Sequence, residues 1–206
     1  MIRPRRLPRP WYRGEATEVA PRLLNKLVVT ADGRAGRIVE VEAYQGEEDP
    51  ASHAFRGPTP RNQVMYGPPG HLYVYLSYGV HWCANVVCGP VGEARAVLLR
   101  ALEPVSGLAL MRQARWTDQR RQDDRDLCRG PGRLCQALGV DSTFNGADLV
   151  GPAALIWLAD DGTEPPKRPL ATPRVGISVG VDRLWRFVVD DHPGVGRHPK
   201  SAQLPT

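Results

Sequence analysis

The sequence predicts one α+β domain built on a curved, mostly antiparallel β-sheet that is flanked by helices. Segments in which apolar and polar residues alternate, as in half-buried strands, recur along the chain. The 21 glycines and 20 prolines predict short strands joined by turns and irregular connections. A chain of 206 residues is long enough for a single domain with a sizeable core.

The two ends of the chain differ in composition from its middle. Residues 1–14 are rich in arginine and proline, so we expect a basic flexible arm, and we expect residues 196–206 to form a loose tail. The folded domain then spans residues 15–195. No apolar stretch follows the basic start as a secretory signal requires, and no apolar run approaches the roughly 20 residues of a membrane span. We therefore expect neither a signal peptide nor a membrane protein.

The charged residues favour an anionic partner. The net charge is +5, and nearly all basic residues are arginines, because the only lysines are Lys26, Lys167 and Lys200. Arginine binds phosphate with a bidentate fork and stacks on bases, which makes nucleic acid a plausible partner. The cysteines lack a CxxC spacing, so we expect buried free thiols in place of a zinc site or a disulfide framework. They are Cys83, Cys88, Cys128 and Cys135.

Periodicity predicts the elements of the first half of the chain. Apolar residues at helical spacing indicate a helix over 17–27. Alternation indicates strands over 27–30, 35–44, 71–78, 80–88 and 94–102. Asp32-Gly33 is typical of the hairpin turn between the first two strands, and Glu103-Pro104 should end the last one. Residues 45–70 form a long irregular loop, and such loops are usually functional or mobile.

The second half is predicted with fewer strands. Helices are expected over 106–115 and 129–139, with Gly139 capping the second, and a charged exposed segment over 116–126 lies between them. A short helix or turn is expected at 141–144, and strands within 148–158 and over 184–189. Residues 162–171 are rich in proline and predict a surface loop.

One strand carries the residues of greatest chemical interest. In RIVEVEAY, residues 37–44, the side chains of Glu40, Glu42 and Tyr44 point to the same face. The ordinary interpretation is a half-exposed strand with solvated carboxylates. The alternative is a catalytic carboxylate beside a stacking ring. Arg100 interrupts an apolar strand and needs an acid nearby, for which Glu42 or Glu40 is the natural candidate.

Further candidates lie in the long loop and in the strands after it. His53 is either a surface histidine or a site residue, and Thr59 and Arg61 are of the types that position a phosphate. Tyr73 and Tyr75 share one strand face, and Tyr78 should project at the bend it forms with Gly79. Asn85 lies inside a strand, where its amide needs hydrogen-bond partners or a ligand.

These motifs, taken in order, resemble a known family. RIVEVEAY, the His53 loop, TPRN at 59–62, LYVYLSYG at 72–79 and AVLLRALEP at 96–104 look like the alkyladenine (3-methyladenine) DNA glycosylases. GPGRLCQALG at 130–139 and PRVG at 173–176 also fit, and the resemblance covers roughly residues 15–195. The resemblance implies an enzyme that flips a damaged purine out of duplex DNA and hydrolyses its N-glycosidic bond.

The resemblance also implies roles for individual catalytic and pocket residues. Glu42 matches the acid that activates the attacking water, and Arg100 and the Val175 carbonyl match two further contacts of that water. For the substrate pocket, Tyr44 matches one stacking face, His53 and Tyr75 match the other, and Asn85 matches the residue that crowds the amino group of guanine.

Other positions match the contacts of the family with DNA. Tyr78 matches the wedge that fills the gap left by the extruded nucleotide, and Thr59, Arg61 and Gly176 are assigned to the same DNA interface. Two departures stand out. The family often has a bulkier residue where Val80 stands, and the loop from His53 to Thr59 is shorter or differently built than in the animal members.

The expected activity is simple hydrolysis without strand cleavage, because no lysine in the motif region could form a Schiff base. The expected partner is double-stranded DNA that contains 3-methyladenine, hypoxanthine, ethenoadenine or 7-methylguanine. We expect no cofactor, no metal and a monomer, located in the nucleoid-containing cytoplasm if the source is bacterial and in the nucleus if it is eukaryotic. Two alternatives stay open: a carbohydrate glycosidase with Glu40 and Glu42 as paired acids, and a non-catalytic nucleic-acid-binding domain.

Overall fold

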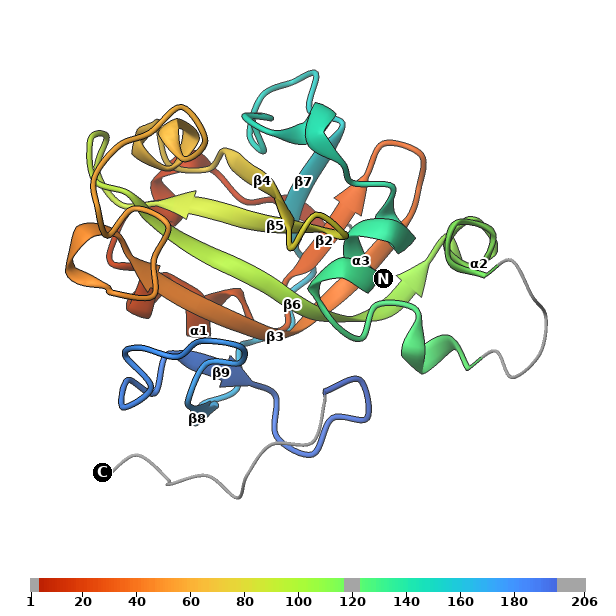
Figure 1. Ribbon diagram of the computed structural model, residues 1–206. Helices are drawn as coiled ribbons and strands as arrows, with labels where there is room; N and C mark the ends of the chain where they lie inside the picture. The colour runs from red at the N-terminus through yellow and green to blue at the C-terminus, as the bar shows by residue number, and fades with distance from the viewer. Residues whose placement is uncertain (1–3, 117–122, 196–206) are drawn as a thin grey trace.

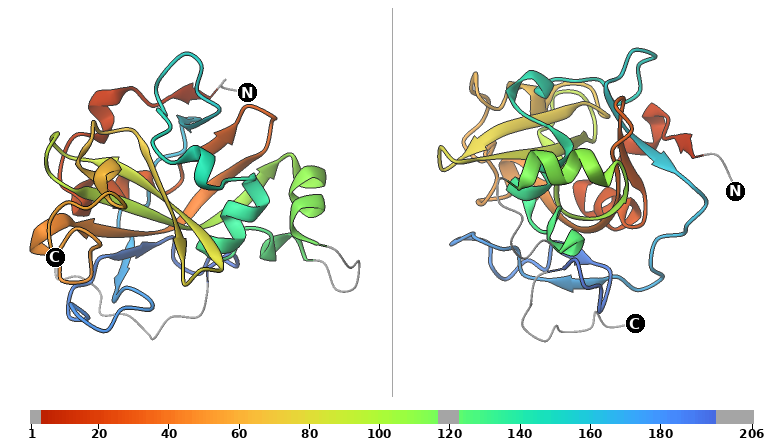
Figure 2. Two further views of the ribbon diagram at one scale, coloured as in Figure 1. Left: turned by 45° about the horizontal axis from the view of Figure 1, so that its top comes forward. Right: turned by 90° about the vertical axis from the view of Figure 1, so that its right-hand side faces the viewer.

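The fold is organised around one antiparallel sheet, seen in the computed structural model of Figure 1, which describes residues 4–116 and 123–195. Its strands follow one another in the order β1-β7-β2-β3-β6-β5-β4, and β9 joins β3 while β8 joins β9. The strands are β1 Arg5–Arg6, β2 Leu27–Thr30, β3 Ala35–Gln45, β4 Leu72–Ser77, β5 His81–Cys88, β6 Arg95–Ser106, β7 Ile156–Asp160, β8 Leu170–Thr172 and β9 Arg186–Val188. Every strand pairing in these ranges is antiparallel, and the sheet curls as Figure 2 shows, which confirms the predicted fold class.

In the described part of the chain, three α-helices accompany the sheet: α1 Ala16–Leu23, α2 Leu108–Arg115 and α3 Pro131–Leu138. α1 packs against β3, and α3 packs against β5 and α2. Gly139 follows α3 in the left-handed conformation, with φ of 69°, as expected for a C-terminal cap. α1 ends earlier than the predicted 17–27, because Asn25 has a φ of 66° and cannot continue a helix.

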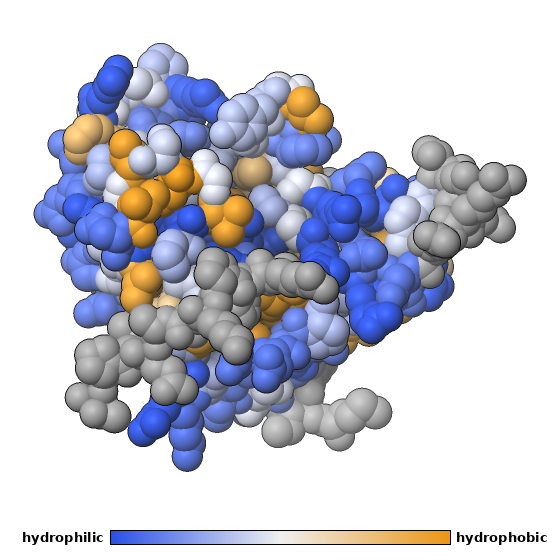
Figure 3. All heavy atoms as spheres, turned by 60° about the horizontal axis from the view of Figure 1, so that its bottom comes forward, coloured by the Kyte–Doolittle hydropathy of each residue, from blue (hydrophilic) through white to orange (hydrophobic). Residues whose placement is uncertain are grey.

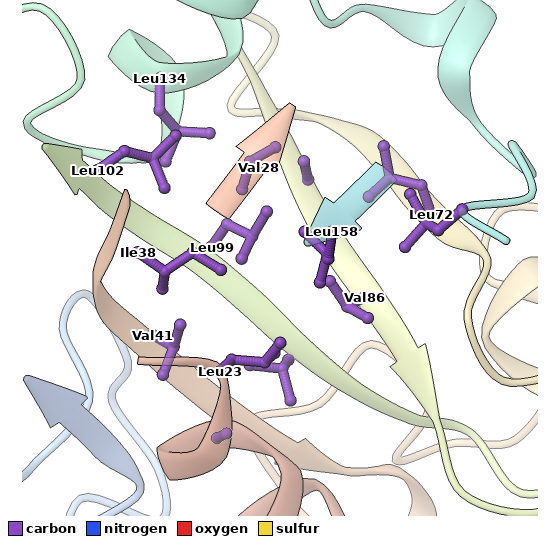
Figure 4. Packing of buried hydrophobic residues seen from close by; sticks show 14 of the residues in the cluster. Leu23, Val28, Ile38, Val41, Leu72, Val86, Leu99, Leu102, Leu134 and Leu158 are labelled. Atoms are coloured by element: carbon purple, nitrogen blue, oxygen red, sulfur yellow. The ribbon is translucent and has the colours of Figure 1, made fainter. Parts of the chain in front are cut away.

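The main hydrophobic core lies between the concave side of the sheet and the helices. Ten of its residues, which come from α1, α3 and six strands, point toward one another in Figure 4: Leu23, Val28, Ile38, Val41, Leu72, Val86, Leu99, Leu102, Leu134 and Leu158. Each fully buried Leu, Ile or Val contributes roughly 1.5–3 kcal/mol through removal of apolar surface from water. The core therefore stabilises the long pair β3 and β6, on which the candidate site is built.

The pairing of β3 with β6 is irregular where the acidic residues lie. The register shifts on both sides of Glu40, between Ile38 and Glu40 and between Glu40 and Val41. β9 joins β3 at the same place, pairing Glu40 with Val188 and Glu42 with Arg186. Such bulges re-aim side chains, and here β3 has neighbours on both sides at the level of its two carboxylates.

Two predicted features of the strands are wrong. β6 does not end at Glu103-Pro104 but continues to Ser106, because Pro104 lies beyond the part of β6 that pairs with β5 and so leaves no ladder bond unmade on that side. The segment predicted as a proline-rich surface loop contains the start of β8, whose few residues carry too short a pattern to be recognised. The helices at 108–115 and 131–138 agree with prediction within two residues at each end.

The described part of the predicted N-terminal arm is folded against the sheet. β1 pairs with β7, and the Leu7 amide donates to the Leu158 carbonyl at 2.9 Å. Leu7 and Tyr12 are buried, and Arg9 binds both carboxylate oxygens of Asp148 at 2.8 and 2.7 Å. Arginine and proline dominate the composition, but the apolar residues between them anchor the segment. The predicted tail, 196–206, lies outside the described residues.

The surface is mixed in character. In Figure 3 hydrophilic residues predominate on the face shown, and hydrophobic residues gather in small patches. Within the described ranges, no helix is both long and apolar enough to traverse a bilayer. All four cysteines are buried free thiols, as predicted, and burial raises the pKa of Cys128 to about 12.

Replacing Leu7 by Ala tests whether the N-terminal segment belongs to the fold. Leu7 is 3% exposed and packs in the main core, so we expect the free energy of unfolding to fall by about 2–3 kcal/mol in urea denaturation. The matched control is Leu110→Ala, at a position 43% exposed on α2, which should change stability by less than about 0.5 kcal/mol. Equal stability of the two variants would mean that the segment detaches in solution.

Candidate active site

A pocket of about 540 Å³ lies between the sheet and the loops that follow β3 and β8. Nine of the predicted site residues line it: Tyr44, His53, Arg61, Tyr75, Tyr78, Asn85, Arg100, Val175 and Gly176. Glu42 and Thr59 do not line it. Ten residues outside the predicted set also contribute, and they are Ala51, Ser52, Met65, Tyr73, Ser77, His81, Cys83, Leu98, Pro131 and Ile177. Most of these are apolar or small, and their residue types carry no signal of a site.

Glu42 lies directly behind the wall of this pocket. Its side chain is 0% exposed, and its carboxylate accepts three hydrogen bonds or ionic contacts. The Tyr44 hydroxyl donates to Oε2 at 2.9 Å, the Val175 backbone N–H donates to Oε1 at 2.7 Å, and Arg100 Nη1 lies 3.3 Å from Oε1. All three donors belong to residues that line the pocket. The interpretation of solvated carboxylates on a half-exposed strand is therefore wrong.

Glu40 neutralises two arginines beneath the site. Its Oε1 accepts from Arg100 Nε and from Arg186 Nε, each at 2.7 Å, and its side chain is 5% exposed. Arg186 also donates to the Thr172 hydroxyl at 3.1 Å, which connects β9 with the end of β8. Arg100 thus pairs with both predicted acids, and it comes from β6 on one side of β3 while Arg186 comes from β9 on the other.

Burial and charge act on Glu42 in opposite directions. Desolvation is the largest effect and raises the pKa of this carboxyl, while Arg100, the Val175 N–H and the Tyr44 hydroxyl oppose the rise. The result is a pKa above the ordinary value of 4.5. The pKa of Tyr44 is raised as well, first by burial and then by the charge of Glu42, so its hydroxyl stays protonated and donates. A raised carboxyl pKa beside a pocket is typical of a functional group.

Aromatic side chains form the walls of the pocket. Tyr44 extends from β3, and Tyr73 and Tyr75 extend from β4 with ring centroids 5.5 Å apart in a stacked arrangement. The ring of His53 meets Tyr75 edge to face at 4.4 Å, and its Nδ1 lies 3.1 Å from the Tyr73 hydroxyl. Desolvation, followed by the charge of Arg61, lowers the pKa of His53, so the imidazole is neutral at pH 7.

The loop that carries His53 is held in shape by Asn62, whose role the sequence did not reveal. Its buried amide donates to the carbonyls of His53 at 2.9 Å and Gly57 at 3.1 Å, and its oxygen accepts from the Thr59 amide. Thr59 therefore serves in this turn, at an exposed position outside the pocket. Arg61 reaches the pocket and lies 5.5 Å from the Tyr75 ring centroid.

Tyr78 is 90% exposed at the tip of the β4–β5 hairpin, as its place at a bend predicts. Its φ of 50° is unusual for a residue with a large side chain, and Gly79 after it also has a positive φ, of 70°. Val80, next to it, is 68% exposed. Deeper in the hairpin, Asn85 is buried and donates to the Tyr73 carbonyl at 3.1 Å, so its amide faces the pocket while fixed to the neighbouring strand.

A buried ion pair that sequence reasoning missed lies behind Tyr44. Asp49 and Arg174 are both 0% exposed and bind each other through two oxygen–nitrogen contacts. The two residues are 125 positions apart, so no local pattern connects them. Among the described residues, no group of three His, Cys, Asp or Glu side chains is placed to hold a metal ion.

Comparison with known proteins finds several similar chains that share one name. A protein from Burkholderia lata named "Putative 3-methyladenine DNA glycosylase" is 57% identical over 183 residues, which cover 89% of this chain and 87% of the relative. Proteins of the same name from Rhodopseudomonas palustris and Chlorobaculum tepidum are 52% and 45% identical and cover 84% and 94% of this chain, and 80% and 91% of their own lengths.

These relatives and the family match identify a hydrolase of N-glycosyl bonds that acts in DNA repair. More narrowly, the sequence model of the methylpurine-DNA glycosylases (MPG) matches residues 10–193, and the chain belongs to that family. The resemblance stated from the motifs is thereby confirmed.

Replacing Glu40 by Gln tests the ionic network beneath the pocket. The amide cannot neutralise Arg100 and Arg186, and breaking a buried pair typically costs 3–5 kcal/mol, so we expect a loss of about 3 kcal/mol in urea denaturation. The control is Asp123→Asn, which removes an exposed pair with Arg125 and should leave the unfolding midpoint unchanged. A wild-type midpoint for Glu40→Gln would show that the network carries no net stability.

Proposed function

We propose that the protein excises alkylated or deaminated purines from duplex DNA, with Glu42 as the general base. The observation that carries this proposal is the position of a buried carboxylate one contact behind an aromatic pocket. Three donors hold it, and a carboxylate can accept about four hydrogen bonds, so it keeps capacity for one more, to the O–H of a water. Because no part of Glu42 is exposed, a water reaches it only when Tyr44, Arg100 or Val175 shifts.

The proposed reaction is a direct hydrolysis that forms no covalent intermediate with the enzyme. The water oxygen bonds to C1′ of the sugar, its proton passes to Glu42, and the bond from C1′ to the base breaks with its electron pair on the base. The sugar is oxocarbenium-like as the base leaves, and the negative carboxylate opposes that positive charge. Arg100, which contacts Glu42 and lines the pocket, would hold the water together with the Val175 carbonyl.

The pocket walls suit one flipped purine. Tyr44 would stack on one face of the base, and His53 and Tyr75 would close the other, each stacking contact contributing roughly 1–3 kcal/mol. The Asn85 amide, fixed to β4, would crowd the amino group of an undamaged guanine. A rigid amide at this place would exclude undamaged guanine from the pocket by steric and polar conflict, before the bond-breaking step. The substrates would then be 3-methyladenine, hypoxanthine, ethenoadenine and 7-methylguanine.

The rim of the pocket would contact the duplex. Tyr78, at the hairpin tip, would fill the space of the extruded nucleotide, which offsets part of the unstacking cost of a few kcal/mol. Arg61, Thr59 and Gly176 lie around the same opening or in its loops and would bind the DNA backbone. None of the described lining residues is a lysine, which supports hydrolysis without strand cleavage. We propose that one copy of the chain acts alone, on the chromosomal DNA of a bacterial cytoplasm.

The carbohydrate glycosidase alternative is disfavoured by the state of Glu40. That carboxylate is locked between Arg100 and Arg186, so it is not free to give a proton to a leaving group. A paired-acid mechanism requires one carboxyl that stays protonated and reaches the substrate. Glu40 does neither.

Glu42→Gln tests the proposed base. The amide preserves size but cannot accept a proton, so we expect the single-turnover excision of hypoxanthine to fall about 10³-fold while lesion-DNA binding persists. Excision is measured as alkali-labile nicks in a duplex that contains one hypoxanthine. The control is Glu47→Gln, an exposed acid five residues further along the chain, which should excise at the wild-type rate. A wild-type rate for Glu42→Gln would remove Glu42 from the mechanism.

The pH dependence tests the same role independently. Glu42 must be ionised to accept a proton, and its pKa is raised above 4.5, so the rate should fall as pH decreases through a value above 4.5. The substrate of choice is 7-methylguanine, since this cationic base leaves without being protonated first. We expect the excision rate of the wild type to fall at acidic pH, which is the acidic limb of its pH–rate profile. We expect this limb to be absent in Glu42→Gln. A limb that persists in the variant would belong to another group.

A further inference from the structure

The Asp49–Arg174 pair is placed to control the geometry of the site from behind. Arg174 Nη2 lies 2.7 Å from Asp49 Oδ1, and Nη1 donates to the Ala43 carbonyl at 3.0 Å. Ala43 stands between Glu42 and Tyr44 on β3, so the guanidinium is bonded to the peptide group between Ala43 and Tyr44. Asp49 in turn accepts from the amides of Gln45 and Ala51 and so shapes the loop after β3.

Arg174 also supports the ring of Tyr44. Its guanidinium carbon lies 4.6 Å from the Tyr44 ring centroid and 5.1 Å from that of Trp185. Arg183 lies 4.6 Å from the Trp185 ring, so cations and rings alternate from the surface to the pocket wall. Because Tyr44 lines the pocket, this column ends at the ring on which the proposed base would stack.

The residue after Arg174 provides the third connection. The Val175 N–H donates to Glu42 Oε1 at 2.7 Å, so the backbone at Arg174 determines where that donor points. One buried guanidinium is therefore bonded or stacked to groups on both sides of the carboxylate. A planar fork can bind a carboxylate, a carbonyl and a ring face at once, which an ammonium group cannot do.

We propose that Arg174, held by Asp49, is a positioning residue that keeps the Val175 N–H on Glu42 and presses Tyr44 into place as the stacking platform. This inference rests on the function proposed above. A buried ion pair is often no more stabilising than apolar residues of the same volume. Here its use is geometric, because it fixes a donor and a ring that arise from distant parts of the chain.

Asp49→Asn separates positioning from simple electrostatics. Removing a negative charge near Glu42 would by itself favour the ionised carboxyl and move the acidic limb of the rate to lower pH. Loosening Arg174 would instead weaken the Val175 hydrogen bond and move the limb to higher pH. The other charged or titratable groups around Glu42, namely Arg100, Tyr44 and Glu40, are unchanged in this variant. We expect a shift to higher pH and a fall of about 10- to 100-fold in single-turnover rate on 7-methylguanine DNA.

Arg174→Lys and Trp185→Leu complete the series. Arg174→Lys keeps the positive charge but loses the planar guanidinium. It should therefore shift the acidic limb to higher pH, as Asp49→Asn does, but by a smaller amount. Trp185→Leu leaves the ion pair intact and removes one ring of the column, which provides a milder test should the other variants fold poorly. The matched control is Lys26→Met, which breaks the 2.9 Å ion pair between the buried Lys26, just before β2, and the partly exposed Asp160 at the end of β7. It should lower stability without moving the limb.

A second measurement avoids catalysis. In the Glu42→Gln background, Asp49→Asn should lower the preference for a hypoxanthine duplex over an undamaged one about tenfold, because the Tyr44 platform is loosened. The inference is overturned if the acidic limb of the pH–rate profile stays in place or moves to lower pH in Asp49→Asn, Arg174→Lys and Trp185→Leu. It is also overturned if the binding preference is unchanged. Neither result touches the proposed function, which fails only if Glu42→Gln itself excises at the wild-type rate.

Discussion

The structure depends on the neutralisation of two carboxylates that lie buried on one strand. Glu40 and Glu42 are next to each other on the same face of β3, and taking both out of water is costly unless cations face them. Arg100 on β6 and Arg186 on β9 supply that charge from opposite sides of β3. β9 must therefore join β3 at the level of the acids, and the bulges at Glu40 turn its carboxylate toward both arginines.

Around this fixed centre, the parts of the site differ in how they are held. Glu42, Tyr75 and Asn85 stand on strands, so their positions follow from the sheet. His53 and Val175 stand on loops, and buried polar residues hold those loops in turn: Asn62 binds the His53 carbonyl, and Arg174 precedes Val175. The residues on strands are therefore held rigidly by the sheet. The pocket walls that stand on loops depend on a few hydrogen bonds.

The sequence revealed those features that depend on neighbours along the chain. The strand around Glu42, the hairpin turn at Asp32-Gly33 and the projecting Tyr78 are local, and all three agree with the structure. The roles of individual residues came from resemblance to a family. Burial of Glu42 could not be read locally, since glutamate is ordinarily exposed and the distant Val175 and Arg100 contribute to its cover. The anchoring of residues 4–14 and the Asp49–Arg174 pair likewise arise from contacts across more than a hundred positions.

The burial of the cysteine thiols affects how the protein withstands the reagents that methylate DNA. Reagents that methylate purines also methylate sulfur, and the thiolate is the form that reacts. Cys88, Cys128 and Cys135 are 0% exposed, and burial raises the pKa of each, so these sulfurs are both inaccessible and protonated. Three of the strongest nucleophiles of the molecule are thus protected from the methylating reagents that would create its proposed substrates, and its core can stay intact while DNA is being methylated.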